Sequence, residues 1–221
     1  MLRNAITCGT LKPGERLVEQ KLAAKLGIGQ PTLREALKHL EYEGFVRKVP
    51  QRGTYVTKLG EEDYRKVMEV RILLEGFAVA LAARKFNAQA EAEIAGLVEK
   101  MAKATSHSDF AGFHEQDVAF HRKIWELAGN EYLTKALESI TFPVFAFALL
   151  DFRPNLSKSR QAAVQQHEGI LAGLRSHDPI KARQAFIDHT LHYWNETYNL
   201  DLKQDWPDHR PGLHLWPEGV K

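Results

Sequence analysis

Four residues in the second half of the chain have the types and spacing of metal ligands. Asp117 and His121 are four residues apart and therefore share one face of a helix, and His167 and His189 follow in two later segments. Three imidazoles and one carboxylate suit Zn²⁺, Ni²⁺ or Mn²⁺ better than Mg²⁺ or Ca²⁺, which favour all-oxygen shells. The pattern predicts a divalent transition-metal site, with zinc as the first choice.

Each of these residues also has a simpler interpretation. A single buried histidine more often hydrogen-bonds a backbone carbonyl than binds a metal, and Asp117 with His121 can be an ordinary pair on one helix. An unpaired carboxylate in an apolar core is costly, so Asp117 requires a cationic partner in either case. Spacing alone leaves both interpretations open.

Apolar residues at helical spacing predict the elements that position these four side chains. Nothing between Gly60 and Leu200 resembles a strand, so we expect an antiparallel all-α bundle in residues 60–200. The candidate ligands interrupt the apolar faces of the third, fifth and sixth helices and should point into the core. The predicted helices span residues 61–85, 88–103, 109–128, 131–150, 157–176 and 179–199. Pro143 lies inside the fourth of them and is predicted to kink it. The first carries an apolar face of Val67, Val70, Leu74, Phe77 and Leu81.

Residues 19–44 have the pattern of two short helices joined by a tight turn. Gly27 can end the first helix in a left-handed conformation, and Pro31 fits the first turn of the second. The second helix has one apolar face, formed by Leu33, Ala36, Leu37 and Leu40. Its opposite face carries Gln30, Arg34 and Lys38. This arrangement is typical of a recognition helix that reads base edges in the major groove.

Two β-prone runs, residues 45–49 and 54–57, follow the second helix and are joined by the turn-forming residues 50–53. Helix, turn, helix and hairpin in this order predict a winged helix-turn-helix over residues 1–59. The whole chain is therefore predicted to be mainly α, with one small β hairpin. Residues 201–221 lack periodicity and are predicted to form an irregular tail.

Charge is divided unevenly along the chain. Residues 1–60 hold eleven Lys or Arg against five Asp or Glu, whereas the remainder holds nineteen against twenty-three. A basic head on an acidic body suits a DNA-binding module fused to a second domain. The single Cys8 excludes an internal disulfide, and no apolar run is long enough to span a membrane or to direct secretion. We therefore expect a cytoplasmic protein.

The head resembles the winged-helix domain of GntR-type bacterial transcription regulators. The motifs PGERL, LAAKLG, PTLREAL, LEYEGFV and RGTYV occur in the expected order between Leu11 and Val56. The resemblance implies an operator in double-stranded DNA and a base-contacting role for Arg34. The chain has Gly29 and Gln30 where the family usually has Ser or Thr followed by Arg, so a helix cap and a base-reading charge are replaced. The expected DNA-binding residues are Arg34, Gln30, Gln20, Thr32, Lys38, Arg52 and Gly53.

The body resembles the FCD ligand-binding domain, of the six-helix VanR-like type, that often follows a GntR head. The segments DVAFHRKIWELAGN, QQHEGILAGL and FIDHTLHYW are similar to its three metal-binding helices. The resemblance implies that Asp117, His121, His167 and His189 bind the metal. In VMEVRILLEGFA it implies that Arg71 faces an effector pocket, where a guanidinium can clamp a carboxylate. A surface pair between Arg71 and Glu75 is the alternative.

These features together predict a homodimeric, metal-containing transcription regulator, with repression the expected sign, and no enzymatic activity. Its operator binding would respond to a small carboxylate effector, and a two-fold dimer would match a palindromic operator. The main alternative is a metal-dependent hydrolase that uses the same Asp and His residues. Four protein ligands leave less room for an activated water than the usual three, and no HExxH motif is present.

Overall fold

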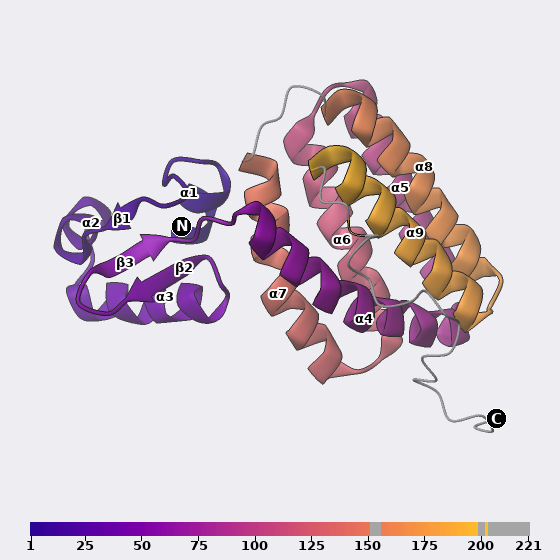
Figure 1. Cartoon of the computed structure of the whole chain (residues 1–221), viewed down its shortest axis with the longest axis horizontal. Coiled ribbons are helices and arrows are strands. Elements are labelled where there is room, and N and C mark those ends of the chain that lie inside the picture. Colours follow the sequence, from indigo (N-terminus) through magenta and orange to yellow (C-terminus); the bar gives the residue numbers. More distant parts are fainter. Residues whose placement is uncertain (151–155, 199–201, 203–221) are drawn as a thin grey trace.

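The protein folds into an N-terminal head, residues 1–59, and a bundle formed by the six helices that follow (Figure 1). The computed structural model describes residues 1–150, 156–198 and 202. The predicted fold class is confirmed, because the described elements are mostly helices and the strands form one small sheet in the head. The tail predicted for residues 201–221 lies outside the described residues apart from Leu202.

The head contains the predicted helix-turn-helix and wing. In chain order its elements are α1 (Leu2–Thr7), β1 (Arg16–Leu17), α2 (Glu19–Leu26), α3 (Gln30–Tyr42), β2 (Val46–Val49) and β3 (Gly53–Val56). The antiparallel sheet has the order β1-β3-β2, with Tyr55 opposite both Arg16 and Arg47. Gly27 ends α2 in the left-handed conformation, at φ 66°. The strand β1 was not predicted, because two residues carry too little periodicity.

The bundle consists of α4 (Glu61–Lys85), α5 (Ala88–Ser106), α6 (Phe110–Ala128), α7 (Glu131–Leu150), α8 (Leu156–Arg175) and α9 (Pro179–Tyr198). Local chemistry sets several of these ends. The side chains of Asn87 and Asp109 accept hydrogen bonds from the first-turn amides of α5 and α6, and Gly129 ends α6 at φ 69°. The helix bounds therefore lie within a few residues of the predicted ones.

The orientation of α4 differs from what its apolar pattern indicates. Val70 belongs to the predicted apolar face, yet it is 45% exposed, and the neighbouring Leu73 is 38% exposed. The buried face instead includes Arg71 and Glu75 alongside Met68. Because apolar and charged residues of α4 are not separated onto two sides of the helix, periodicity could not identify the side that faces the bundle.

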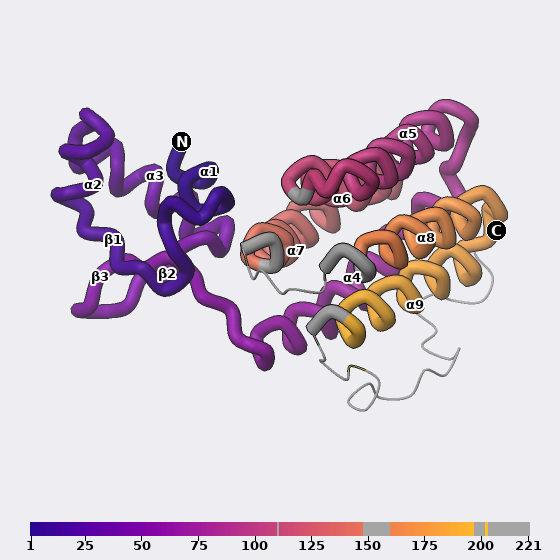
Figure 2. Tube along the Cα trace, turned by 90° about the horizontal axis from the view of Figure 1, so that it is seen from above, coloured from indigo at the N-terminus to yellow at the C-terminus, as the bar shows by residue number. Residues whose placement is uncertain are grey.

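The helix α7 lies on the side of the bundle nearest the head in both views (Figures 1 and 2). Its residues Ala146 and Phe147 are buried in the apolar core of the head, where the Phe147 ring lies 6.3 Å from that of Phe45. Gly44 has φ 78°, and a Cβ there would lie 2.9 Å from Cγ of Pro143. The head and α7 therefore share a packed apolar contact. The predicted kink at Pro143 stays a prediction.

Candidate metal centre and DNA-binding surface

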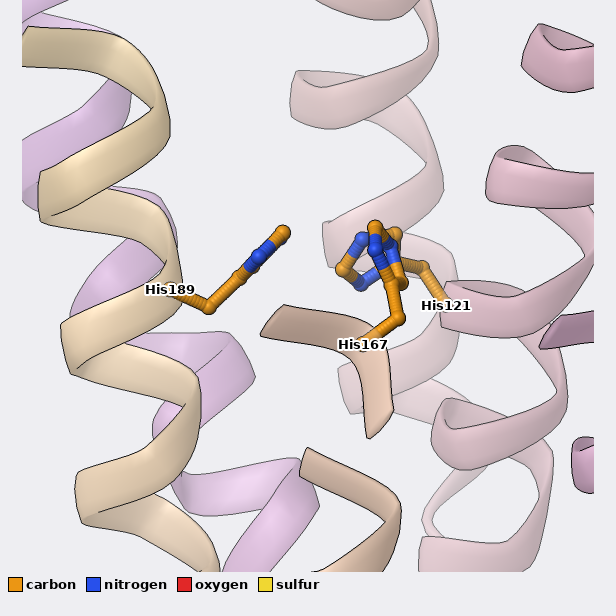
Figure 3. Close-up of side chains that lie close together, drawn as sticks. All are labelled: His121, His167 and His189. Atoms are coloured by element: carbon orange, nitrogen blue, oxygen red, sulfur yellow. The ribbon is translucent and has the colours of Figure 1, made fainter. Parts of the chain in front are cut away.

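Three histidine side chains converge inside the bundle from three helices (Figure 3). They are His121 on α6, His167 on α8 and His189 on α9, all buried, and each offers a ring nitrogen within 4.8 Å of those of the other two. Oδ1 of Asp117 lies 2.8 Å from Nε2 of His167 and 3.6 Å from Nε2 of His121. The structure thus brings the four residues predicted from the sequence to one place.

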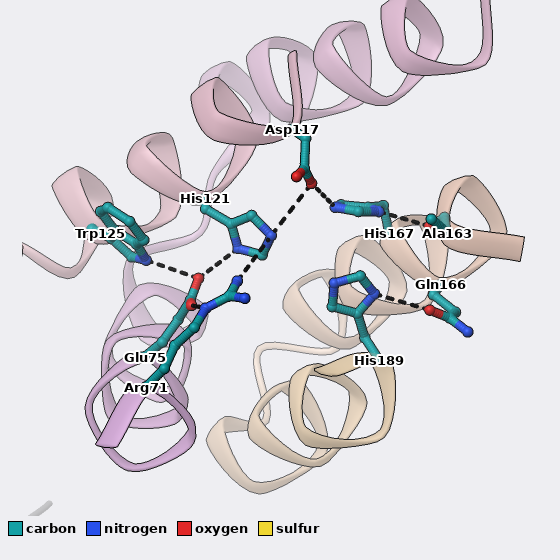
Figure 4. Close-up of polar contacts among 9 residues, drawn as sticks. All are labelled: Arg71, Glu75, Asp117, His121, Trp125, Ala163, Gln166, His167 and His189. Atoms are coloured by element: carbon teal, nitrogen blue, oxygen red, sulfur yellow. Dashed lines mark hydrogen bonds and ion pairs between the residues drawn. The ribbon is translucent and has the colours of Figure 1, made fainter. Parts of the chain in front are cut away.

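Hydrogen bonds to the outer side of each imidazole determine which nitrogen faces the centre (Figure 4). Nδ1 of His121 donates to Oε1 of Glu75 over 2.5 Å, and Nδ1 of His167 donates to the Ala163 carbonyl over 2.6 Å. Nδ1 of His189 donates to Oε1 of Gln166 over 3.2 Å. Each Nδ1 therefore carries a proton, which leaves the Nε2 lone pair available for a metal.

The contact between His167 and Asp117 is a direct test of whether a cation fits here. Nε2 of His167 is buried and makes no geometrically acceptable hydrogen bond to any described residue, although a carboxylate oxygen lies 2.8 Å away. Two acceptor atoms at this distance repel each other unless a proton or a metal ion lies between them. Three imidazole nitrogens and one carboxylate oxygen make a donor set that fits Zn²⁺, Ni²⁺ or Mn²⁺.

A buried ion pair supports the first of these ligands. Nε of Arg71 donates to Oε2 of Glu75 over 2.7 Å, and Nε1 of Trp125 donates to Oε1 of the same carboxylate over 2.9 Å. Both members of the pair are buried, so the alternative of a surface pair is wrong. Glu75 was not predicted as a site residue. The sequence places Glu75 one turn after Arg71, which indicates a pair between these two residues. Nothing in the sequence shows that Glu75 also contacts His121.

Burial and charge act in opposite directions on the two carboxylates. Burial alone would raise the pKa of Glu75, but the charges of Arg71 and His121 and the donated hydrogen bonds lower this pKa to about 2. Burial also opposes ionisation of Asp117, whereas the neighbouring imidazoles of His121 and His167 hold its pKa well below the usual value. Both groups are therefore anionic at neutral pH and favour a cation beside them.

The imidazoles respond to the same neighbours. Burial tends to lower the pKa of His121, but the negative charge of Glu75 raises it, so this ring holds a proton more tightly than an ordinary imidazole. Burial and the other two histidines hold the pKa of His189 well below its usual value. A histidine that stays neutral at physiological pH has its lone pair free for a metal.

Arg71 also reaches the metal-binding side of the cluster. Its Nη2 lies 3.4 Å from Nε2 of His121, and its guanidinium stacks over the ring of Phe145 at 4.7 Å. The predicted effector-binding residue therefore lies beside the predicted metal ligands. Its Nε is already engaged by Glu75, so its terminal nitrogens are the groups that face the centre.

The residues predicted to contact DNA are all exposed, and α2 lies at the end of the head farthest from the bundle (Figure 1). Gln20 lies on α2, and Gln30, Thr32, Arg34 and Lys38 lie on α3. Gly29 occupies the N-cap position of α3 and makes no side-chain hydrogen bond to the helix. This agrees with the expected loss of the cap where glycine replaces the usual Ser or Thr. Arg52 and Gly53 form the wing turn, where Gly53 has φ 101°, a conformation that glycine adopts without strain. The side chains on α3 and the wing turn are therefore both accessible to a partner.

These features define a winged helix-turn-helix protein with an all-α second domain. Comparison with known proteins agrees: residues 1–56 match the bacterial regulatory proteins of the gntR family, and residues 66–192 match the FCD domain. The chain belongs to the GntR family of DNA-binding transcription regulators, in the group that carries an FCD domain.

Several relatives cover most of the chain. It is 29% identical to a probable D-xylose utilization operon transcriptional repressor of Paenarthrobacter nicotinovorans, over 85% of this chain and 81% of that protein. It is 26% identical to the gluconate operon transcriptional repressor of Bacillus subtilis, over 92% of this chain and 81% of that protein. The solved structure of E. coli McbR/YncC is similar with a TM-score of 0.73 and 24% identity, over 90% of this chain and 93% of that one, and supports the fold. Among the described residues, no helix combines the length and apolar character needed to cross a membrane.

Proposed function

We propose that this protein is a metal-containing, homodimeric transcriptional repressor whose operator binding responds to a small organic acid bound in the bundle. The observation that carries the proposal is the convergence of ring nitrogens from three buried histidines and the Asp117 carboxylate beside Arg71. His121, His167, His189 and Asp117 would hold the metal. A bound divalent ion would supply a Lewis-acidic binding point for an anionic oxygen.

The charge of the site supports an anionic effector. Arg71 and a divalent metal together carry three positive charges, whereas the ionised Glu75 and Asp117 carry two negative ones. A carboxylate that contacts both the metal and the terminal nitrogens of Arg71 would neutralise the excess. Relatives that repress gluconate and D-xylose operons make gluconate a reasonable first compound for an effector screen.

A route from the site to the head runs through one turn of α7. The ring of Phe145 lies 5.4 Å from that of His121 and under the Arg71 guanidinium, while Phe147, two residues later, packs in the head core. Pro143 on the same helix contacts Gly44, directly after the recognition helix. A ligand that shifts Phe145 could therefore affect α3 through the packed residues of α7. It would change operator binding if it bound the protein more tightly in one arrangement of the head than in another.

The exposed side of α4 supports a dimer. Val70 and Leu73 are exposed there and continue into the half-buried Phe77 and Leu81 along the same helix. A second copy of the chain is the partner that we propose for this stripe, because a two-fold arrangement places two heads on a palindromic operator.

Replacing Arg34 by alanine tests the DNA-binding part of the proposal. An arginine that pairs with a guanine edge contributes about 1–3 kcal/mol of discrimination, so the preference for the operator should fall roughly 5- to 150-fold. Fluorescence anisotropy with DNA from upstream of the gene and with scrambled DNA, each at two salt concentrations, measures this preference. Unchanged sequence preference in the folded variant would contradict the assigned role of Arg34.

Replacing Phe147 by alanine tests the route through α7. Allosteric coupling is typically about 1–3 kcal/mol, so we expect zinc-loaded and chelator-treated wild-type protein to differ roughly 5- to 150-fold in operator affinity. In Phe147→Ala this ratio should fall towards one, because the contact with Phe45 is lost. Tyr132→Ala, an exposed aromatic residue on the same helix, is the control and should keep the wild-type ratio. A full ratio in Phe147→Ala would exclude this route.

A further inference from the structure

We propose that Glu19 is a specificity-determining residue, which fixes the direction of the Arg34 guanidinium before DNA is bound and thereby sharpens base discrimination. The inference rests on the proposed base-reading role of Arg34. Glu19 itself is not expected to contact a base, because its carboxylate is engaged by Nε of Arg34.

The contact joins the two helices of the helix-turn-helix. Oε2 of Glu19, in the first turn of α2, accepts a hydrogen bond from Nε of Arg34 over 2.8 Å. The Arg34 side chain is 59% exposed and that of Glu19 is 31% exposed, so the pair lies on the surface with the guanidinium as the outer member. Glu19 is thus placed beneath the tip of the arginine that faces the DNA.

The atom that Glu19 engages leaves the reading atoms of Arg34 available. With Nε bound to the carboxylate, the two terminal nitrogens remain free to donate in parallel to O6 and N7 of a guanine. An arginine is a long side chain with many rotamers, and holding one of them lowers the entropy lost when the base contact forms. The correct base gains from this orientation, whereas a random sequence does not.

The charge of Glu19 acts in the same direction. Non-specific binding depends on attraction between basic side chains and phosphates, and a carboxylate beside Arg34 weakens this attraction for every sequence. Removing Glu19 should therefore strengthen binding to unrelated DNA while it weakens discrimination between bases. A residue with a merely structural role would lower both affinities together.

The chain offers a matched control for the change in charge. Glu35 lies on α3 next to Arg34, but its carboxylate accepts a hydrogen bond from Lys38 over 2.8 Å. Glu35→Ala removes one negative charge from the same surface and leaves the contact between Glu19 and Arg34 in place. Both variants should raise non-specific affinity, and Glu19→Ala alone should reduce base discrimination.

The test begins with selection of preferred sites by the full-length protein from randomised 30-base-pair duplexes. Wild type, Glu19→Ala, Glu35→Ala, Arg34→Ala and the double variant Glu19→Ala/Arg34→Ala are then compared on the selected duplex and on duplexes with each guanine replaced in turn. We expect Glu19→Ala to reduce discrimination at the guanine read by Arg34 about two- to five-fold, the range associated with an exposed ion pair. In the Arg34→Ala background the same change should have no further effect on discrimination.

The outcomes separate the two levels of the proposal. If Arg34→Ala leaves discrimination unchanged, the role of Arg34 in the proposed function fails, and the inference about Glu19 fails with it. If Arg34→Ala reduces discrimination but Glu19→Ala does not, or does so no more than Glu35→Ala, the inference alone is overturned. Circular dichroism confirms that each variant is folded before its binding is compared.

Discussion

If the cluster binds zinc as proposed, replacing His189 by glutamine is expected to lower the affinity of the protein for zinc by roughly 100- to 1,000-fold. Metal sites with four protein ligands bind zinc with about 10–16 kcal/mol, so each ligand contributes roughly 2.5–4 kcal/mol. The loss exceeds the roughly 10- to 100-fold that follows loss of an outer partner of a ligand. Glutamine retains a polar group near the half-buried Gln166 and fills most of the space of the imidazole.

The measurement is competition for zinc against a chromophoric chelator, together with the metal content of the purified protein. His192→Gln is the matched control, because His192 lies one turn further along α9 and is exposed. We expect wild-type affinity from this control. Similar zinc affinities for wild type and His189→Gln would show that the cluster is an ordinary set of buried histidines, and the metal would then have to be removed from the proposed function.

Replacing Glu75 by leucine destabilises the bundle by about 3–5 kcal/mol, the cost associated with removing one partner of a buried ion pair. The change leaves the Arg71 guanidinium, Nδ1 of His121 and Nε1 of Trp125 without their common acceptor. Replacing both Glu75 and Arg71 by leucine should restore most of the lost stability, because no uncompensated charge then remains buried.

Urea denaturation of chelator-treated protein measures this effect without a contribution from metal binding. Glu62→Leu, on the exposed side of the same helix, breaks only a surface pair with Lys66 and should change the free energy of unfolding by less than about 0.5 kcal/mol. Equal effects of Glu75→Leu and Glu62→Leu would refute the structural role of the buried pair. If the double variant is no more stable than Glu75→Leu, the loss of stability comes from lost packing and not from the unpaired charge of Arg71.

The two roles of Glu75 also explain why this carboxylate belongs inside the bundle. It neutralises Arg71, and it fixes the tautomer of His121 so that Nε2 faces Asp117 and the other two histidines. Outer partners of this kind orient metal ligands and raise their basicity. A neutral residue at this position could not do both.

The sequence by itself determined the features that depend on residues close along the chain. Helical periodicity and the caps at Asn87, Asp109 and Gly129 define where the bundle helices begin and end. The four-residue spacing of Asp117 and His121 places both on one face of α6, because 3.6 residues complete a turn. The helix-turn-helix and its wing followed from Gly27, Pro31 and the β-prone runs for the same local reason.

Only the tertiary structure decided the features that join residues far apart in the sequence. The inward side of α4, the contact of Glu75 with His121, the ion pair of Glu19 with Arg34 and the packing of Phe147 against Phe45 all depend on how helices pack. Periodicity can identify an apolar face of a helix but not the helix that packs against it, and in α4 the predicted apolar face was not the most buried one. The partners of each helix are set by packing and burial over the whole molecule, which is why the supporting shell of the site became visible only in three dimensions.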